Sequence, residues 1–192
     1  RCVDEAGRPV STGAPGEVVV RGPNVMKGYF NRPEATAEAW RNGWFHTGDQ
    51  FMQDEHGNFF FLDRIKDVIR RRGENISSFE VEKEVMTHPL VKDVAAVAVK
   101  NPDLHEDAGD EEVKVVVVLE EGSTLDPAEL VDYLAGQMPR HWVPRFIEYV
   151  PELPRTPTHK VMKVELRERG ALTPEVWDRE KAGIKFKRES LS

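Results

Sequence analysis

The chain has 192 residues, a length that fits one large domain or one domain and part of another. Its 27 basic and 34 acidic residues give a net charge of −7, which argues against a dedicated nucleic-acid surface. No apolar run approaches the roughly 20 residues of a membrane-spanning helix, and the scattered histidines lack zinc-type spacing, so no metal site is expected.

Two features at the start of the chain bear on its origin. The first residue is Arg1 rather than methionine and no signal peptide follows it, so we expect a piece of a longer protein. Cys2 is the one cysteine, which excludes an internal disulfide and favours a reducing compartment. We therefore expect the cytoplasm as the location.

Residues 1–63 are predicted to be rich in β-strands. Turn signals and short apolar runs predict strands around Val3–Val10, Glu17–Arg21 and Phe59–Leu62. A short helix is predicted over Pro33–Trp40, because proline is tolerated in the first turn of a helix. One helix and a few short strands cannot enclose a core, so we interpret this part as the β-rich end of a large N-terminal domain.

Residues 64–170 are predicted to form a small α+β C-terminal domain, with a central sheet flanked by helices. Serine at 77 or 78 and aspartate at 126 are expected to cap the two longer helices. Residues 103–112 are predicted to form an exposed acidic loop, and residues 171–192 a polar tail. In chain order the predicted elements are a strand pair around Lys66–Ile69 and Glu74–Ser77, a helix over Phe79–Met86, strands at Val91–Val99 and Val113–Leu119, a helix over Pro127–Met138, a strand at Phe146–Val150 and a helix at Lys163–Glu168.

Three segments carry residues suited to nucleotide chemistry. In the first, Gly43–Asp49, a glycine precedes Asp49, whose carboxylate could accept hydrogen bonds from two neighbouring ribose hydroxyls. Arg64 opens the second segment, and its planar, permanently charged guanidinium could bind ribose and phosphate oxygens together. Taken alone, each feature is also typical of an ordinary hairpin turn or a charged strand.

The second segment continues into a basic run. Five basic residues lie within nine positions from Arg64 to Arg72. The run lacks the interleaved aromatic residues of a single-stranded nucleic-acid site. A charged, solvated strand edge is the simplest interpretation, and contact with the phosphates of coenzyme A is the functional alternative.

The third segment, Pro154–Lys163, holds Lys160 in a loop rich in proline and threonine. A mobile ammonium there could offset the negative charge that develops when a carboxylate attacks a phosphate. Lys163 is a weaker candidate for a phosphate contact. An ordinary surface lysine near a helix start is the alternative for Lys160.

Together, in this order and at these separations, the three segments resemble the last third of the AMP-forming adenylating enzymes. That family includes acyl-CoA synthetases, luciferases and the adenylation domains of peptide synthetases. The resemblance extends over about residues 16–169 and implies a role for each motif residue. It implies Lys160 as the catalytic residue, Thr47, Asp49 and Arg64 as nucleotide-binding residues, Lys66 as the hinge, and Arg72, Gly73, Glu74 and Asn75 as the coenzyme A site.

Two details of the motifs indicate a branch of the family. Residues 73–76 read Gly-Glu-Asn-Ile, a form typical of acyl-CoA synthetases, whereas peptide synthetases usually show Gly-x-Arg-Ile-Glu. His159 stands before Lys160 where the family usually has glycine. Variants with a larger residue there resemble the carnitine/crotonobetaine-CoA ligase-like members.

The resemblance implies part of an ATP-dependent acid–CoA ligase. Its substrates would be a carboxylic acid, ATP and coenzyme A, with Mg²⁺ bound to the ATP, and the residues that select the acid would lie outside this chain. A Gly/Ser/Thr-rich phosphate-binding loop is absent from the sequence, so we expect the isolated chain to be inactive. Two alternatives stay open, a non-catalytic nucleotide- or partner-binding module and a peptide-synthetase adenylation domain.

Overall fold

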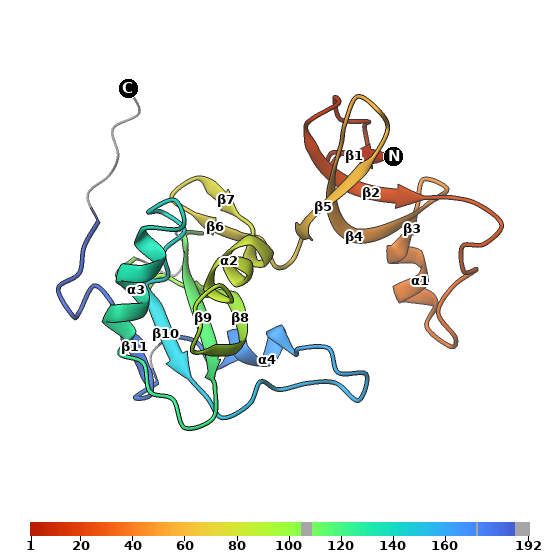
Figure 1. Ribbon diagram of the computed structural model, residues 1–192. Helices are drawn as coiled ribbons and strands as arrows, with labels where there is room; N and C mark the ends of the chain where they lie inside the picture. The colour runs from red at the N-terminus through yellow and green to blue at the C-terminus, as the bar shows by residue number, and fades with distance from the viewer. Residues whose placement is uncertain (105–108, 172, 187–192) are drawn as a thin grey trace. The chain divides into compact units, whose positions relative to one another are not determined.

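The computed structural model describes residues 1–104, 109–171 and 173–186, and the chain forms two compact units (Figure 1). The smaller unit is Arg1–Lys66, and the larger unit begins at Asp67. The sequence places this division three residues earlier, between residues 63 and 64.

The smaller unit is built around one long strand that the sequence did not predict. This strand, β4, runs over Trp44–Gln53 and pairs with three neighbours in a five-stranded sheet. Gly48-Asp49, which taken alone is also typical of a hairpin turn, lies within this strand, and a register shift follows between Gln50 and Phe51. The other elements of the unit are β1 (Cys2–Val3), β2 (Pro15–Val20), α1 (Pro33–Ala39), β3 (Trp40–Arg41) and β5 (Phe59–Arg64).

The smaller unit buries little apolar surface. Its fully buried hydrophobic side chains are Cys2, Val3 and Val19. Three successive phenylalanines of β5, Phe59, Phe60 and Phe61, are 41–48% exposed. These open apolar side chains are consistent with the interpretation that this unit is the end of a larger domain.

The larger unit has a four-stranded sheet in the order β8, β9, β10, β11. β9 and β10 are parallel and joined by a helix, whereas the other pairs are antiparallel. A two-stranded hairpin, β6 with β7, accompanies the sheet. The bounds are β6 Ile69–Arg71, β7 Glu74–Ile76, α2 Ser78–Val85, β8 Val91–Lys100, β9 Glu111–Leu119, α3 Pro127–Ala135, β10 Phe146–Tyr149, α4 Lys163–Glu168 and β11 Val176–Asp178.

Both faces of this sheet are covered, as the alternation of side chains along β8 shows. Val94 and Ala96 pack with residues of the hairpin, α2 and α3, whereas Ala95 and Val97 pack on the opposite face with Leu166 of α4. The sequence of a strand that is buried on both faces is a continuous apolar run. The predicted α+β class with helices flanking a central sheet is confirmed.

The helix caps are as predicted, but some helices end at a different residue from the predicted one. The Ser77 hydroxyl accepts a hydrogen bond from the backbone of Glu80, and Asp126 caps α3 through Ala128. α3 ends at Ala135 rather than at Met138, with Gly136 as its C-cap residue.

Two predictions about polar segments are wrong in part. Residues 171–192 were predicted to be a tail, but β11 lies within them and pairs with β10, with Asp178 buried. The acidic loop predicted at 103–112 ends earlier, because Glu111 and Glu112 begin β9. Residues 105–108 of that loop lie outside the described part of the chain.

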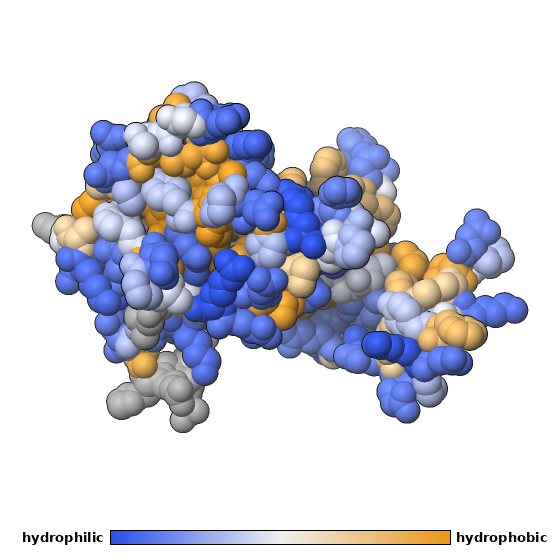
Figure 2. Space-filling view, turned by 90° about the horizontal axis from the view of Figure 1, so that it is seen from below, coloured by the Kyte–Doolittle hydropathy of each residue, from blue (hydrophilic) through white to orange (hydrophobic). Residues whose placement is uncertain are grey.

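The surface of the larger unit is mixed. Figure 2 shows a hydrophobic area on this unit with hydrophilic side chains around it. Within the described ranges, no helix combines the length and the apolar character that crossing a membrane requires.

Candidate functional site

The Thr47-Gly48-Asp49 segment is held by hydrogen bonds from β2. The Thr47 hydroxyl donates to the carbonyl of Val18 at 2.7 Å and accepts from the backbone N–H of Asp49 at 3.1 Å. Gly48 has a φ of 72°, a conformation that glycine adopts without strain. Since the one hydroxyl proton of Thr47 is already donated, Thr47 shapes the segment and could only accept a further hydrogen bond.

Asp49 and Arg64 are brought together by the pairing of β4 with β5. The two residues are direct partners in the antiparallel register, and Arg64 Nε lies 3.3 Å from Asp49 Oδ1. Both side chains are accessible, at 51% for Arg64 and 31% for Asp49. The structure therefore places a guanidinium and a carboxylate side by side on an open surface of the smaller unit.

Glu17 supports this segment and was missed by the sequence analysis. Its Oε1 accepts from the backbone of Gly48 at 3.0 Å, and its Oε2 lies 2.6 Å from Nδ1 of His46. A largely buried carboxylate thus binds the glycine next to Asp49. The only signal in the sequence is an acidic residue within the otherwise apolar strand Pro15–Val20.

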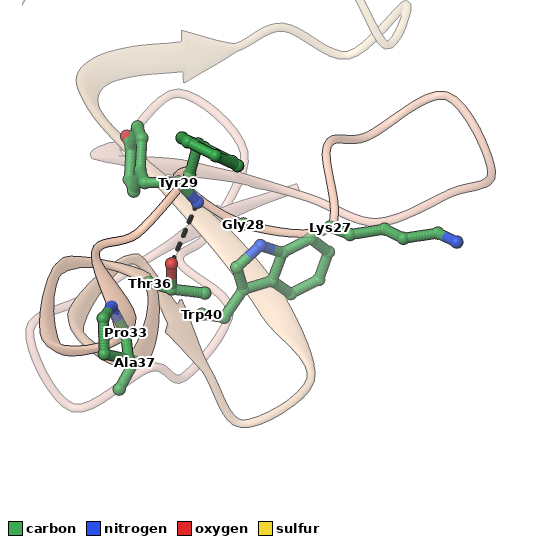
Figure 3. Close-up of a pocket in the computed structure, with 8 residues that line it drawn as sticks. Lys27, Gly28, Tyr29, Pro33, Thr36, Ala37 and Trp40 are labelled. Atoms are coloured by element: carbon green, nitrogen blue, oxygen red, sulfur yellow. Dashed lines mark hydrogen bonds between the residues drawn. The ribbon is translucent and has the colours of Figure 1, made fainter.

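A pocket in the smaller unit lies beside α1 and is separate from these residues (Figure 3). Trp40 and Tyr29 line it, and the Thr36 hydroxyl accepts a hydrogen bond of 2.9 Å from the backbone of Tyr29. A Cβ on Gly28 would lie 2.7 Å from Thr36, so this close approach requires glycine. None of the predicted site residues is among those that line this pocket.

Lys66 is the last residue of the smaller unit, and the next residue is anchored in the larger one. Asp67 is buried and forms an ion pair with Arg167 of α4. Lys66 itself is exposed. A backbone rotation at Lys66 would therefore leave Asp67 fixed to the helix that follows the Lys160 loop.

The predicted coenzyme A residues form the tip of the β6–β7 hairpin. Arg72 and Gly73 have φ values of 54° and 82°, the two positive values of a tight two-residue hairpin turn. Glu74 begins β7 and pairs with His141 at 2.7 Å, and Asn75 is exposed. The side chains of Arg72 and Asn75 at the tip are thus exposed to solvent.

Arg71 does not belong to the exposed basic run. It is buried, with Nε 2.7 Å from Oε2 of Glu112, which is itself fully buried. Burial raises the pKa of Glu112 and lowers that of Arg71, while the opposite charge of each partner counteracts the shift. Since side chains alternate along a strand, Arg71 shares the inner face with Ile69, whereas Arg70 points outward. Arg72, in the turn after β6, is also exposed.

The Lys160 loop has a defined backbone and a free ammonium. The carbonyl of Lys160 accepts from Thr156 N at 2.8 Å, and its N–H donates to the Thr156 hydroxyl at 3.2 Å. Arg155 braces the loop by donating to the carbonyl of His159 at 2.7 Å and by pairing with Asp93 of β8. No partner of the Lys160 ammonium is found within the described ranges.

Lys163 differs from Lys160 because its ammonium is already bound. It lies 2.7 Å from Oε1 of Glu82 and 2.8 Å from the hydroxyl of Ser78, both on α2. Lys163 thus joins α4 to α2, and its ammonium is not available as the weaker phosphate-binding candidate that the sequence suggested.

His159 has a φ of 63°, the left-handed conformation that favours glycine. The loop therefore keeps the backbone shape that the family's usual glycine would adopt, at some cost in strain. We expect His159→Val to unfold more easily than His159→Gly by about 1–2 kcal/mol, because a β-branched residue disfavours this conformation. Urea unfolding of the two variants measures the difference, and equal stability would show that the loop adopts another backbone conformation.

Among the residues that the structure describes, no group of three histidine, cysteine, aspartate or glutamate side chains is placed to hold an ion.

Comparison with known proteins relates the chain to one enzyme family. The AMP-binding enzyme C-terminal domain matches residues 80–160. A feruloyl-CoA synthase of Amycolatopsis sp is 44% identical over 169 residues, which are 88% of this chain and 33% of the relative. A crotonobetaine/carnitine–CoA ligase of Salmonella typhimurium is 38% identical over 168 residues, 85% of this chain and 32% of the relative.

A solved structure has the same fold over most of the chain. The crystal structure of ATP-bound MatB from Rhodopseudomonas palustris matches with a TM-score of 0.78 and 36% identity, covering 88% of this chain and 33% of that one. The chain therefore spans about a third of the length of the relatives that it matches.

Proposed function

We propose that the chain is the C-terminal part of an ATP-dependent acid–CoA ligase, because most of it is similar to about a third of several CoA ligases and it contains a match to the AMP-binding enzyme C-terminal domain. In the complete enzyme, a carboxylate attacks the α-phosphate of ATP, giving acyl-AMP and pyrophosphate. The thiol of coenzyme A then attacks the acyl carbon, giving acyl-CoA and AMP.

The observation that carries this proposal is the free ammonium of Lys160 on a loop with a fixed backbone. In the first step, negative charge builds between the carboxylate and the phosphate, and an ammonium delivered there stabilises the transition state. Lys114 and Lys163 could not do this without first breaking contacts of 2.6 Å and 2.7 Å to glutamates. The resemblance of the Pro154–Lys163 motif implies the catalytic role of Lys160, and the lack of a bound partner among the described residues leaves its ammonium open to that role.

Asp49 and Arg64 are proposed to bind the nucleotide. The two oxygens of the Asp49 carboxylate suit the paired hydroxyls of a ribose, and the neighbouring Arg64 suits the oxygens of ribose and phosphate. Thr47 is also proposed to bind the nucleotide, as a hydrogen-bond acceptor, while its hydroxyl holds Asp49 in place. Mg²⁺ would arrive with ATP and offset phosphate charge.

The larger unit is proposed to rotate about Lys66 between the two steps. The anchoring of Asp67 to Arg167 supports a hinge at Lys66, because it limits the change of backbone angles to the residues before it. The turn of Arg72, Gly73, Glu74 and Asn75 would then line the channel for the pantetheine arm of coenzyme A. The proposed place of this reaction is the cytoplasm.

The test is carboxylate-dependent exchange of pyrophosphate into ATP, measured with aromatic acids and with carnitine-type acids. The complete polypeptide that contains these residues should catalyse exchange and, with coenzyme A, release AMP. The 192-residue chain alone should catalyse neither step. Exchange by the isolated chain, or none by the complete protein with any acid of the panel, would refute the proposal.

A further inference from the structure

Three successive acidic residues contact three successive arginines at the β6–β7 hairpin. Glu111 and Glu112 begin β9 and Asp110 precedes it, whereas Arg70 and Arg71 end β6 and Arg72 lies in the turn. The backbone N–H of Arg70 donates to Oε2 of Glu111 at 2.8 Å. The backbone N–H of Arg72 donates to the carboxylate of Asp110. Between them, Arg71 forms its buried ion pair with Glu112. Each residue from 70 to 72 thus has its own acidic partner.

These contacts take the place of a third strand beside the hairpin. The N–H of Arg70, within β6, and the N–H of Arg72, in the turn that follows, both donate to these acids. β6 pairs with β7 through its other edge. Hydrogen bonds to an ionised acceptor are about twice as strong as those between neutral groups. Asp110 and Glu111 therefore secure an edge that the two-stranded sheet leaves unpaired.

Two of the acids, Glu111 and Glu112, belong to a strand inside the main sheet. β9 is an inner strand of the sheet, paired with β8 and β10. Glu112 also lies 4.0 Å from Arg145, whose guanidinium makes two hydrogen bonds of 3.2 Å to the buried Asp178 at the end of β11. A group whose own supports are locked can hold a flexible neighbour in one geometry.

We propose that Asp110 and Glu111 are positioning residues for the second step of the reaction, because they hold the turn from Arg72 to Asn75 in the shape that guides coenzyme A. This inference rests on the proposed function of the turn. The two carboxylates do not touch the reacting atoms; they act through the backbone of Arg70 and Arg72. The Lys160 loop has its own braces, Arg155 and Asp93, so the first step does not depend on these acids.

The kinetic test separates the two steps in the complete ligase. In Asp110→Ala/Glu111→Ala, we expect acyl-AMP formation within about 2-fold of the parent and transfer from acyl-AMP to coenzyme A slowed about 10- to 100-fold, as misplacement of a substrate-guiding group predicts. The matched control is Glu120→Ala/Glu121→Ala, which removes two exposed acids just beyond the other end of β9. Both steps should be unchanged in the control.

A structural readout on the 192-residue chain is independent of activity. Hydrogen exchange at the amides of Arg70 and Arg72 should become about tenfold faster in the double variant, while the amides of β8 keep their rates. Unchanged exchange would overturn the inference. Faster exchange with normal transfer to coenzyme A would also overturn it, as would equal slowing of both steps. If the parent forms no acyl-AMP, the proposed function fails, whereas the exchange result still tests the contact.

Discussion

Replacing Lys160 with alanine should slow acyl-AMP formation by about 10²–10³-fold in the complete ligase and leave the stability of the fold unchanged. The expected loss is that of one preorganised charge in the transition state, about 3–4 kcal/mol. Stability should not change, because the Lys160 ammonium is exposed and its fixed contacts are those of the backbone. Single-turnover release of pyrophosphate measures the effect.

Lys163→Met is the matched control for this prediction. It removes an ammonium three residues away that binds Glu82 and Ser78. Lys163→Met should therefore lower the free energy of unfolding of the larger unit and have little effect on the rate of acyl-AMP formation. Transfer of preformed acyl-AMP to coenzyme A should stay normal in Lys160→Ala. A Lys160→Ala variant that forms acyl-AMP at the parental rate would refute the catalytic assignment.

The second large effect is expected on stability, from Arg71→Leu. This change leaves the buried carboxylate of Glu112 without its nearest partner, and breaking a buried ion pair in this way typically costs about 3–5 kcal/mol. Urea unfolding of the 192-residue chain measures the loss. In Arg71→Leu/Glu112→Leu the loss should be smaller, because no unpaired buried carboxylate is left.

The loss of stability in Arg71→Leu should depend on pH in a defined direction. Burial raises the pKa of Glu112 in the folded state, and removing the Arg71 charge raises it further. A carboxyl with a raised folded-state pKa destabilises the fold as the pH rises above its unfolded value of about 4.3. The difference in the free energy of unfolding between the parent chain and Arg71→Leu should therefore be smaller at about pH 5 than at about pH 7.

Arg70→Leu provides the control for both measurements. Its side chain is exposed on the same strand, so the change should cost less than about 1 kcal/mol and show no comparable dependence on pH. Equal losses for Arg70→Leu and Arg71→Leu would show that burial of the ion pair does not determine the stability of this region.

The elements that could be predicted were those with a local signal. The caps Ser77 and Asp126 bind backbone N–H groups two or three residues away. A short stretch of sequence is therefore enough to predict them. The apolar runs of β8 and β9 indicate strands for the same reason. β4 was missed because Gly48-Asp49 has the composition of a turn, and the pairing of β4 with β2, β3 and β5 overrides that local preference.

Some residues of the candidate site could be predicted from the sequence and others could not, for the same reason. Lys160, Asp49 and Arg64 stand out through motifs in which order and spacing carry the signal. Glu17 did not stand out, because its contact with Gly48 joins residues that are 31 positions apart. The burial of Arg71 was also hidden, since three successive arginines look alike until the partner of each is known.

The sequence by itself determined the α+β class, the motif residues and the relation to an adenylating enzyme, because these depend on short patterns and on their order. Only the tertiary structure decided which charges are buried, that the Lys163 ammonium is already bound to an acid, and which acids contact the hairpin. Those properties depend on contacts such as Arg71 with Glu112 and Lys163 with Glu82. Such pairs lie tens of residues apart and meet only when the sheet and its helices have packed.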